Sequence, residues 1–393
     1  MRQRSLVPSR AVACAVLALA ALAPAPLVAQ SSLFGTRGLG IPGRAQSVRA
    51  LGTGGSFGMF DGGSSENPAA LSDITVLTAT FTGMQNFRSS SAPSGSVSGR
   101  DTRFPQITVA GPVGRRPFSV GASYSTYTDR DFRVATTSEV QLRGVPITSS
   151  DTLTSRGGLN DLRLGVAWRG PSAWNVGAAF HLITGSARTE LRRGFSDTTY
   201  SPVFQTAEIS YAGVGVSVGV LHAMGPITFA AMARTDGNAN VDRDSTRVSR
   251  VGLPASFGAG LRYDAGPRLD LAAQGIYRSW SAADAALIAG GGTGAQNTVD
   301  LAVGGEYTTD LRRPYRRPIR FGAHYTRLPF PVLADERPSE FGVALGSGTR
   351  FLEPRSRREV AGLDVALEHV WRREGTGYRE SAWLITFGVT IRP

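Results

Sequence analysis

Period-two alternation of apolar and polar residues, repeated from Ile74 to the C-terminus, is the feature that most constrains the fold of this chain. The stretches "LRLGVAW" (162–168), "VDLAVGGEY" (299–307) and "WLITFGVTI" (383–391) show it most clearly. Successive side chains of a strand point to opposite faces, so these stretches predict strands with one apolar face. The chain is therefore predicted to be all-β.

The connections between the predicted strands alternate between short and long. Short turns such as "GPVGRRP" (111–117) and "HAMGPI" (222–227) contain Gly and Pro. The long polar stretches, predicted as loops, are 89–102, 137–158, 191–205, 236–250, 281–297 and 329–338. Such alternation is typical of an up-and-down meander whose two ends face different environments, as in outer-membrane barrels.

Counting on this basis predicts about fourteen strands, an even number as in other bacterial single-chain barrels. An even count places both chain ends at the periplasmic side. The predicted strands cover 74–88, 103–111, 118–136, 159–169, 174–190, 207–221, 227–235, 251–263, 269–280, 298–309, 318–328, 339–351, 360–373 and 381–392.

Charged residues in mid-strand favour a membrane barrel over a soluble β-sandwich or propeller. A sandwich shows the same alternation, because it also buries one face of each strand. Mid-strand charges on the less apolar face suit a watered or ion-paired lumen instead, and aromatic residues near the strand ends resemble interface girdles. The candidate lumen-facing residues are Arg163, Asp300, Glu306, Arg320, His324, Asp364 and Glu368. The predicted fold is a transmembrane up-and-down antiparallel β-barrel over residues 74–393.

The first 29 residues read as a cleaved signal peptide. Three arginines precede an apolar run, Ala11–Ala23, and "APAPLVAQ" offers a small-residue cleavage site after Ala29. This pattern is typical of secretory signals, since the run is too short and too closely followed by prolines for a membrane anchor; a buried core helix is the alternative. Cys14, the single cysteine, lies inside the run, so the mature chain is predicted to have neither disulfides nor cysteine metal sites.

The chain carries a net charge of +12, and its basic residues are all Arg. Guanidinium groups bind phosphate in a bidentate fashion. Export favours outer-membrane lipid and lipopolysaccharide over nucleic acid as the partner. A generally basic surface without a specific ligand is the alternative.

A Gly- and Ser-rich segment, 30–73, precedes the first predicted strand. It contains too many apolar residues for a solvated linker. The lumen of a barrel of this size is either open or filled. Residues 30–73 are therefore predicted to form a hatch inside the barrel, with a turn at Asn67–Pro68 because proline biases the preceding residue away from helix.

The stretch "GTGGSFGMFDGGSSENPAALS" (52–72) resembles the N-terminal hatch signature of the FadL-type transporters of long-chain fatty acids, with Asn67, Pro68 and Ala69 as the matching motif. "RFGAHYTRLPFPVLADERPSEFGVALGSGTRF" (320–351) resembles the closing strands of that family. The resemblance implies a fourteen-stranded barrel with a small hatch. It also implies passive outer-membrane uptake of long-chain fatty acids or other hydrophobic compounds, without a cofactor.

Within this resemblance, an apolar lumen pocket holds the ligand, and a hatch movement or a lateral opening of the wall releases it. Two features depart from the family pattern. The chain ends in "GVTIRP", without a terminal aromatic residue, and no single Gly or Pro break marks a lateral opening in the third predicted strand.

Two other functions stay open at this stage. The superfamily also includes shuttle barrels of type IX secretion, which implies a periplasmic or secreted protein as partner. A charged lumen is also compatible with a general diffusion porin. The hydrophobic transporter is the primary prediction.

An enzymatic function is not predicted. The histidines lie on four different predicted strands, at positions 181, 222, 324 and 369, and no Gly-x-Ser-x-Gly pattern accompanies them. No clustered metal ligands occur at zinc-site spacing. A Walker motif is impossible without Lys. Hydrogen bonding in the lumen or the girdles is the expected role of these histidines.

Overall fold

The computed structural model describes residues 32–93, 95–243, 246–312, 317–353 and 358–393. The predicted signal peptide (1–29) and its cleavage site lie outside the described residues.

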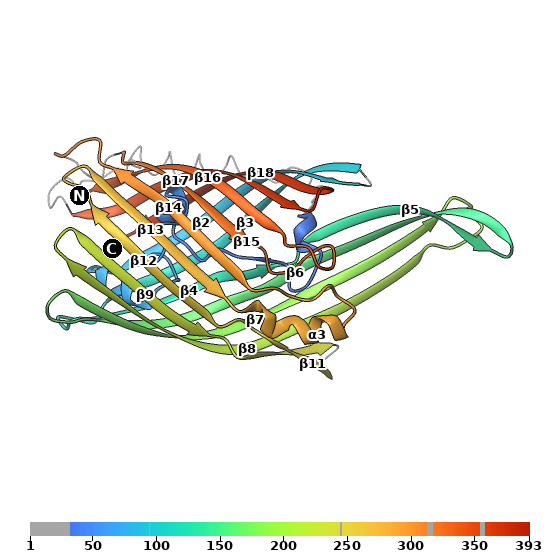
Figure 1. Cartoon of the computed structure of the whole chain (residues 1–393), viewed down its shortest axis with the longest axis horizontal. Coiled ribbons are helices and arrows are strands. Elements are labelled where there is room, and N and C mark those ends of the chain that lie inside the picture. The colour runs from blue at the N-terminus through green and yellow to red at the C-terminus, as the bar shows by residue number, and fades with distance from the viewer. Residues whose placement is uncertain (1–31, 94, 244–245, 313–316, 354–357) are drawn as a thin grey trace, which may run out of the picture.

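Fourteen antiparallel strands form a closed barrel (Figure 1), which confirms the predicted fold class and strand count. Each wall strand pairs with the next, and the last pairs with the first. In order, the wall strands are β2 (Thr78–Ala92), β3 (Gly95–Pro112), β4 (Phe118–Asp129), β6 (Val145–Arg169), β7 (Trp174–Phe195), β8 (Val203–Met224), β9 (Ile227–Thr235), β12 (Ser256–Asp264), β13 (Leu269–Arg278), β14 (Thr298–Tyr307), β15 (Ile319–Arg327), β16 (Ser339–Leu352), β17 (Glu359–Glu374) and β18 (Tyr378–Ile391).

The exposure of the wall residues is the reverse of that in a soluble protein. On β6, Leu164 and Val166 are 56% and 42% exposed, whereas Asp161 and Arg163 are only 2% and 3% exposed. An apolar exterior around a charged interior is the arrangement that a lipid environment favours. The alternation in the sequence therefore reports an apolar outer face and a polar inner face.

Several stretches predicted as loops are strands, and these predictions were wrong. Most of 137–158 belongs to β5 (Phe132–Leu142) and to β6, and the two ends of 191–205 lie in β7 and β8, whereas 196–202 is a loop as predicted. The 236–250 stretch forms the hairpin of β10 (Asn238–Arg243) and β11 (Thr246–Gly252), and most of 89–102 extends β2 and β3. These stretches are rich in Thr, Ser and Val, which favour strands even where both faces meet water.

The strand predicted over 118–136 is also interrupted, because β4 ends at Asp129 and β5 begins at Phe132. β4 and β5 both pair with β6, one after the other. β5, the outer parts of β6, β7 and β8, and their connections extend well beyond the barrel (Figure 1). We call this extension (132–158 and 186–210) the arm.

Helical elements are short. They are η1 (Leu33–Gly35), α2 (Val48–Gly52), η2 (Pro68–Asp73), η3 (Trp280–Ala283) and α3 (Asp284–Ala289). No helix within the described ranges is long and apolar enough to cross a membrane.

Residues 32–73, which we call the lumen segment, run through the barrel. Ser32 bonds to Glu380, next to the turn between β17 and β18 at the loop end, whereas η2 packs against β6, β7 and β8 near the short turns. The segment then enters β2 after a short link. It therefore spans the lumen from the loop end to the turn end, and its first described residues do not lie at the end where the wall strands start and finish.

Candidate functional site

The Asn67-Pro68-Ala69 motif forms a tight corner against the barrel wall. Asn67 caps η2, where its Oδ1 accepts a hydrogen bond from the Ala69 N–H at 3.0 Å, and its Nδ2 donates to the Val220 carbonyl at 3.4 Å. Gly219 of β8 lies at this contact, where a larger residue would not fit, because its Cβ would lie 1.9 Å from Asn67 Oδ1. The motif thus fixes where the lumen segment touches β8.

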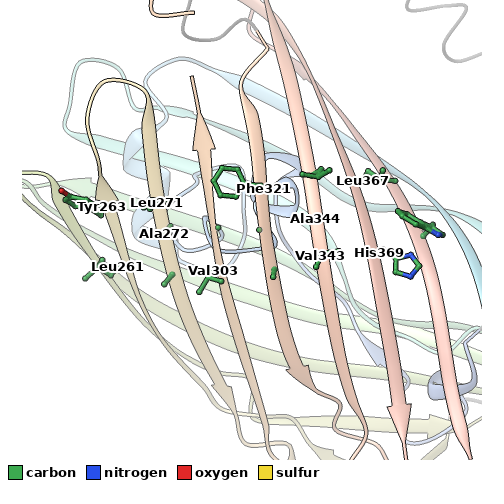
Figure 2. A pocket seen from close by; sticks show the side chains of 16 residues that line it. Leu261, Tyr263, Leu271, Ala272, Val303, Phe321, Val343, Ala344, Leu367 and His369 are labelled. Carbon is green, nitrogen blue, oxygen red and sulfur yellow. The ribbon is translucent and has the colours of Figure 1, made fainter. Parts of the chain in front are cut away.

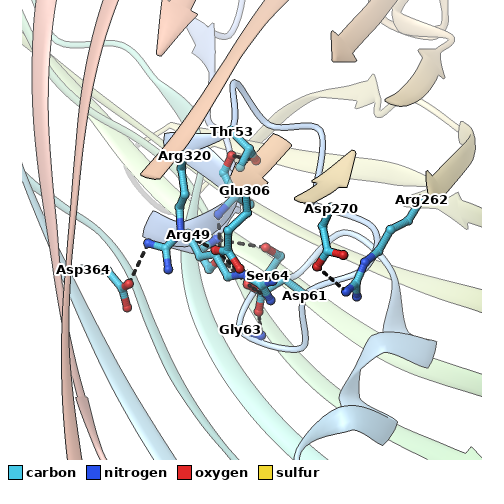
Figure 3. Close-up of polar contacts among 12 residues, drawn as sticks. Arg49, Thr53, Asp61, Gly63, Ser64, Arg262, Asp270, Glu306, Arg320 and Asp364 are labelled. Carbon is cyan, nitrogen blue, oxygen red and sulfur yellow. Dashed lines mark hydrogen bonds and ion pairs between the residues drawn. The ribbon is translucent and has the colours of Figure 1, made fainter. Parts of the chain in front are cut away.

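A chain of ion pairs joins the lumen segment to the opposite wall (Figure 3). Arg49 of α2 binds Glu306 of β14 at 2.9 Å, and Arg320 of β15 binds the same carboxylate at 2.6 Å. Arg320 also binds Asp364 of β17 at 2.7 Å. Arg49 also lies 3.9 Å from Asp61 of the lumen segment, so its charge faces two carboxylates.

A second charged cluster lies nearer the loop end. Arg44 of the lumen segment pairs with Glu368. His324 is placed between two carboxylates, with Nε2 3.0 Å from Glu340 and Nδ1 3.2 Å from Glu368. Arg372 bridges Glu340 to Glu380, the residue that holds Ser32. Wall carboxylates thus anchor the lumen segment at both Ser32 and Arg44.

Replacing Arg320 by Met is expected to destabilise the barrel by about 1–3 kcal/mol, because Glu306 and Asp364 would each lose a buried hydrogen-bond donor while each keeps a second arginine. The measurement is the free energy of unfolding in denaturant. Arg188→Met, which removes an exposed pair with Glu190 in the arm, is the matched control and should cost about 0–1 kcal/mol. Equal effects of the two substitutions would contradict a structural role for the Arg320 pairs.

The remaining predicted lumen-facing residues also point inward. Arg163 donates to the Ser64 carbonyl of the lumen segment at 3.4 Å. Asp300 pairs with Arg278 and borders a cavity of about 90 Å³ beside Arg44. The structure therefore places all seven candidates in contact with the lumen segment, with its wall partners, or with a lumen cavity.

Ser217, His181 and Asp161 form a chain that sequence reasoning missed. His181 Nε2 lies 2.8 Å from Ser217 Oγ, and Nδ1 lies 2.9 Å from Asp161, a spacing like that of a serine hydrolase triad. His181 has no exposed surface, however, and Asp161 is also held by Arg234 at 2.8 Å. Ser217 is itself only 4% exposed, so we interpret the Ser217–His181–Asp161 contacts as a structural link between β6, β7 and β8.

The contacts of Ser217, His181 and Asp161 could not be predicted from a local sequence pattern, because the three residues lie on separate strands. Among the described residues, no group of three or more His, Cys, Asp or Glu side chains is placed to hold a metal ion.

At the loop end, apolar side chains close the barrel mouth. Leu159, Ile183 and Tyr211 extend from the inner faces of β6, β7 and β8, and they pack with Trp280 and Phe330 from the connections above. Trp280 and Phe330 meet edge to face, with ring centroids 5.1 Å apart. We call these residues and their neighbours the mouth cluster. Packed side chains thus occupy the level where the sequence predicted an apolar pocket.

The wall itself has a seam between β3 and β4. Their pairing starts at Pro112 and stops at Gln106 and Ser125, although both strands continue toward the loop end. Pro105, the next residue of β3 beyond Gln106, has no N–H with which to extend the pairing. The break therefore lies in the second wall strand rather than in the third.

The lumen segment closes this seam from inside. β1 (Ile41–Pro42) pairs with β4 beyond the last β3 contact, through Ile41–Asp129 and Pro42–Thr128. Arg103 of β3 forms an ion pair with Asp129 across the gap. Behind the seam lies a cavity of about 110 Å³, whose lining combines Ile41 and Pro105 with charged side chains that include Arg44, Arg103 and Glu368. Strand β1, the hydrogen bond from the Gly43 N–H to the Tyr127 carbonyl (2.8 Å) and one ion pair thus separate this cavity from the lipid side.

The exterior carries an apolar groove of about 820 Å³ across β12 to β18 (Figure 2). Its rim residues Val303, Val343 and Leu345 are exposed, while Gly304 on the inner face of the same wall touches Thr53 of the lumen segment. The groove therefore faces lipid and is separate from the lumen.

Fold and site together define a membrane-type β-barrel whose lumen is filled by its own N-terminal segment. The sequence model of the BamG family matches residues 15–225, which is more than half of the chain. The protein therefore belongs to the BamG family. A comparison with curated protein sequences finds no match.

Solved structures with the same fold include a FadL homologue and two toluene transporters. A Pseudomonas aeruginosa FadL homologue aligns with a TM-score of 0.60 at 14% identity and covers 90% of this chain and 99% of its own. The Pseudomonas putida toluene transporter TodX (TM-score 0.56, 15% identity) covers 89% of this chain and 98% of its own. The Ralstonia pickettii toluene transporter TbuX (TM-score 0.55, 13% identity) covers 89% and 98%. The predicted resemblance to the FadL-type superfamily is thus confirmed at the level of the fold.

Proposed function

We propose that this protein is a passive outer-membrane channel for hydrophobic compounds, such as long-chain fatty acids or small aromatic hydrocarbons, and not an enzyme. The observation that carries the proposal is the seam between β3 and β4, which places a lumen cavity behind a weakly closed gap in the wall. The fold shared with FadL-type and toluene transporters supports it.

The polarity of the residues along the lumen indicates the path that an apolar solute takes through the barrel. An apolar solute gains about 25 cal/mol for each Å² that it buries, so the mouth cluster is a favourable first site once its side chains separate. Continuing to the turn end would require passage through the ion pairs of Arg49 and Arg320. Exit through the seam leads directly into the membrane, because Phe104 and Tyr124 flank it with exposed apolar surface. No energy input is required.

The two alternatives fit these observations less well. A general diffusion porin needs an open aqueous lumen, whereas the lumen segment is pinned across this one by ion pairs on several strands. A protein-binding barrel of the type IX kind does not require a gated seam.

The test is uptake of radiolabelled oleate and toluene by cells that lack other hydrophobic channels, with and without the protein. Expression is expected to raise uptake of at least one apolar solute several-fold, without leakage of small hydrophilic solutes. Folded protein in the outer membrane that leaves every apolar solute at background would refute the proposal. Co-purification of one protein partner in the same cells would favour the secretion alternative.

A further inference from the structure

The arm extends far beyond what membrane crossing requires. β6 has 25 residues and β7 and β8 have 22 each, whereas a tilted membrane strand needs about 9–11. β5 completes a four-stranded ribbon that leaves the barrel at its loop end (Figure 1). Lipid cannot cover this ribbon, so its surface and edges are available to a partner.

One edge of the ribbon is an open strand. β5 pairs with β6 from Phe132 to Leu142, and no described strand pairs with its other side. Unpaired edges recruit other strands, and proteins usually blunt them with Pro, Lys or bulges. β5 contains no Pro, and its pairing with β6 shows no register shift. Its edge is therefore regular over its whole length.

The turn at the tip identifies which atoms point outward. Arg143 and Gly144 form a two-residue turn with φ of 54° and 80°, the type I′ geometry of a tight hairpin. In such a hairpin the flanking residues, Leu142 and Val145, form a hydrogen-bonded pair, and this alternates along the strand. The N–H and C=O groups of the odd-numbered residues of β5 therefore face away from β6.

The charges on β5 are self-complementary. Arg133 and Glu139 lie three residues before and three residues after Thr136, on the same face. Both are exposed, and within the described chain neither has an ion-pair partner. A second β5 running antiparallel about Thr136 would place Arg133 opposite Glu139 of the second copy, and Glu139 opposite its Arg133. Opposite charges in directly paired positions stabilise a sheet.

The apolar positions match in the same register, because Phe132 would face Val140 of the second copy. We propose that the open edge of β5 pairs with β5 of a second copy of this chain, in a two-fold antiparallel register centred on Thr136. This is an isologous interface, in which the same strand serves both copies. It is independent of whether the barrel carries a solute.

The antiparallel register determines where the two barrels lie relative to each other. The paired strands run in opposite directions, so the two barrels lie at opposite ends of the joined ribbon. The pair therefore links copies in two apposed membranes rather than two neighbours in one membrane.

The mass of the full-length mature protein in detergent, measured by light scattering after size exclusion, tests the pairing. We expect a dimer whose fraction rises with concentration. Arg133→Glu alone and Glu139→Arg alone should each be monomeric, because like charges would then face one another twice. Mixing the two variants in equal amounts should restore the dimer, since each copy supplies the charge that the other requires.

Edge blocking provides a second, independent variant. Thr137→Pro removes an outward N–H, whereas Thr137→Ala keeps it, so the first should be monomeric and the second dimeric. Heat-modifiable gel mobility checks that every variant has folded. A monomeric wild type at every concentration, or a dimer that survives Thr137→Pro, would overturn the proposal.

Vesicles test the relative orientation of the barrels. Liposomes carrying the wild-type protein with outward arms should cluster, as seen by turbidity, and those carrying Thr137→Pro should stay dispersed. Wild-type liposomes that stay dispersed while the detergent sample is dimeric would overturn the antiparallel arrangement.

Discussion

A disulfide between β1 and β4 is expected to abolish uptake of apolar solutes, and a reductant is expected to restore it. Pro42 and Thr128 are register partners, and paired antiparallel residues have Cα atoms about 4.5–5.5 Å apart, within the range that a disulfide spans. In Pro42→Cys/Thr128→Cys, the bond would hold β1 across the seam. If solutes leave through the seam, uptake should fall to that of cells without the protein.

The chain suits this experiment, because its single cysteine, Cys14, lies in the predicted signal peptide. The matched control is Ser138→Cys/Ser149→Cys, a register pair between β5 and β6 with Oγ atoms 3.1 Å apart. That disulfide should form equally well and leave uptake unchanged. Unchanged uptake in the oxidised β1–β4 variant would exclude the seam as the exit, while the channel function itself could still hold through a movement of the lumen segment.

Wall strands could be predicted from the sequence because membrane barrels repeat one simple rule. Each strand alternates between lipid and lumen, so a stretch such as 227–235 was placed with its observed bounds. The same rule placed Arg320 and Asp364 on the inner face, where they form an ion pair. Alternation predicts the face of the sheet on which a residue lies, but it does not predict which inward residues contact each other.

The arm and the seam could not be predicted, for two different physical reasons. The strands of the arm extend beyond the barrel and carry mostly polar side chains, so their composition reads as loop. The seam depends on pairing between segments distant in sequence: Pro105 breaks the β3–β4 ladder, and Ile41–Pro42 of the lumen segment takes over on β4. A proline inside a predicted strand was the one local signal, since proline is confined to strand edges and bulges.

The two ends of the lumen segment have different roles. Its last part, at Asn67 and Pro68, is packed against glycines of β7 and β8 and has little room to move. Its first part closes the seam through only two register pairs, although ion pairs anchor it on either side. A movement limited to residues near Ile41 would therefore open the wall while the rest of the segment continues to fill the lumen.

Displacing the fixed part should open an aqueous pore. A Cβ on Gly177 of β7 would lie 2.4 Å from the Pro68 carbonyl carbon and 2.5 Å from the Ala69 nitrogen, so the clash is with backbone. Gly177→Leu is therefore expected to push the Asn67-Pro68-Ala69 corner away from the wall. In planar bilayers the wild type should show little ion conductance, and the variant should show large, stable conductance steps.

Gly194 provides the matched control on the same strand. It lies in the arm, and a Cβ there would meet only the Ser150 carbonyl, at 4.0 Å. Gly194→Leu should therefore leave the conductance at the wild-type level, which separates a local clash from any general effect of leucine in β7. Limited proteolysis supplies a second measurement, because a displaced corner should become cleavable near residues 61–73 in Gly177→Leu alone. A folded Gly177→Leu variant with wild-type conductance and an uncleaved corner would show that the Asn67-Pro68-Ala69 corner does not hold the lumen closed.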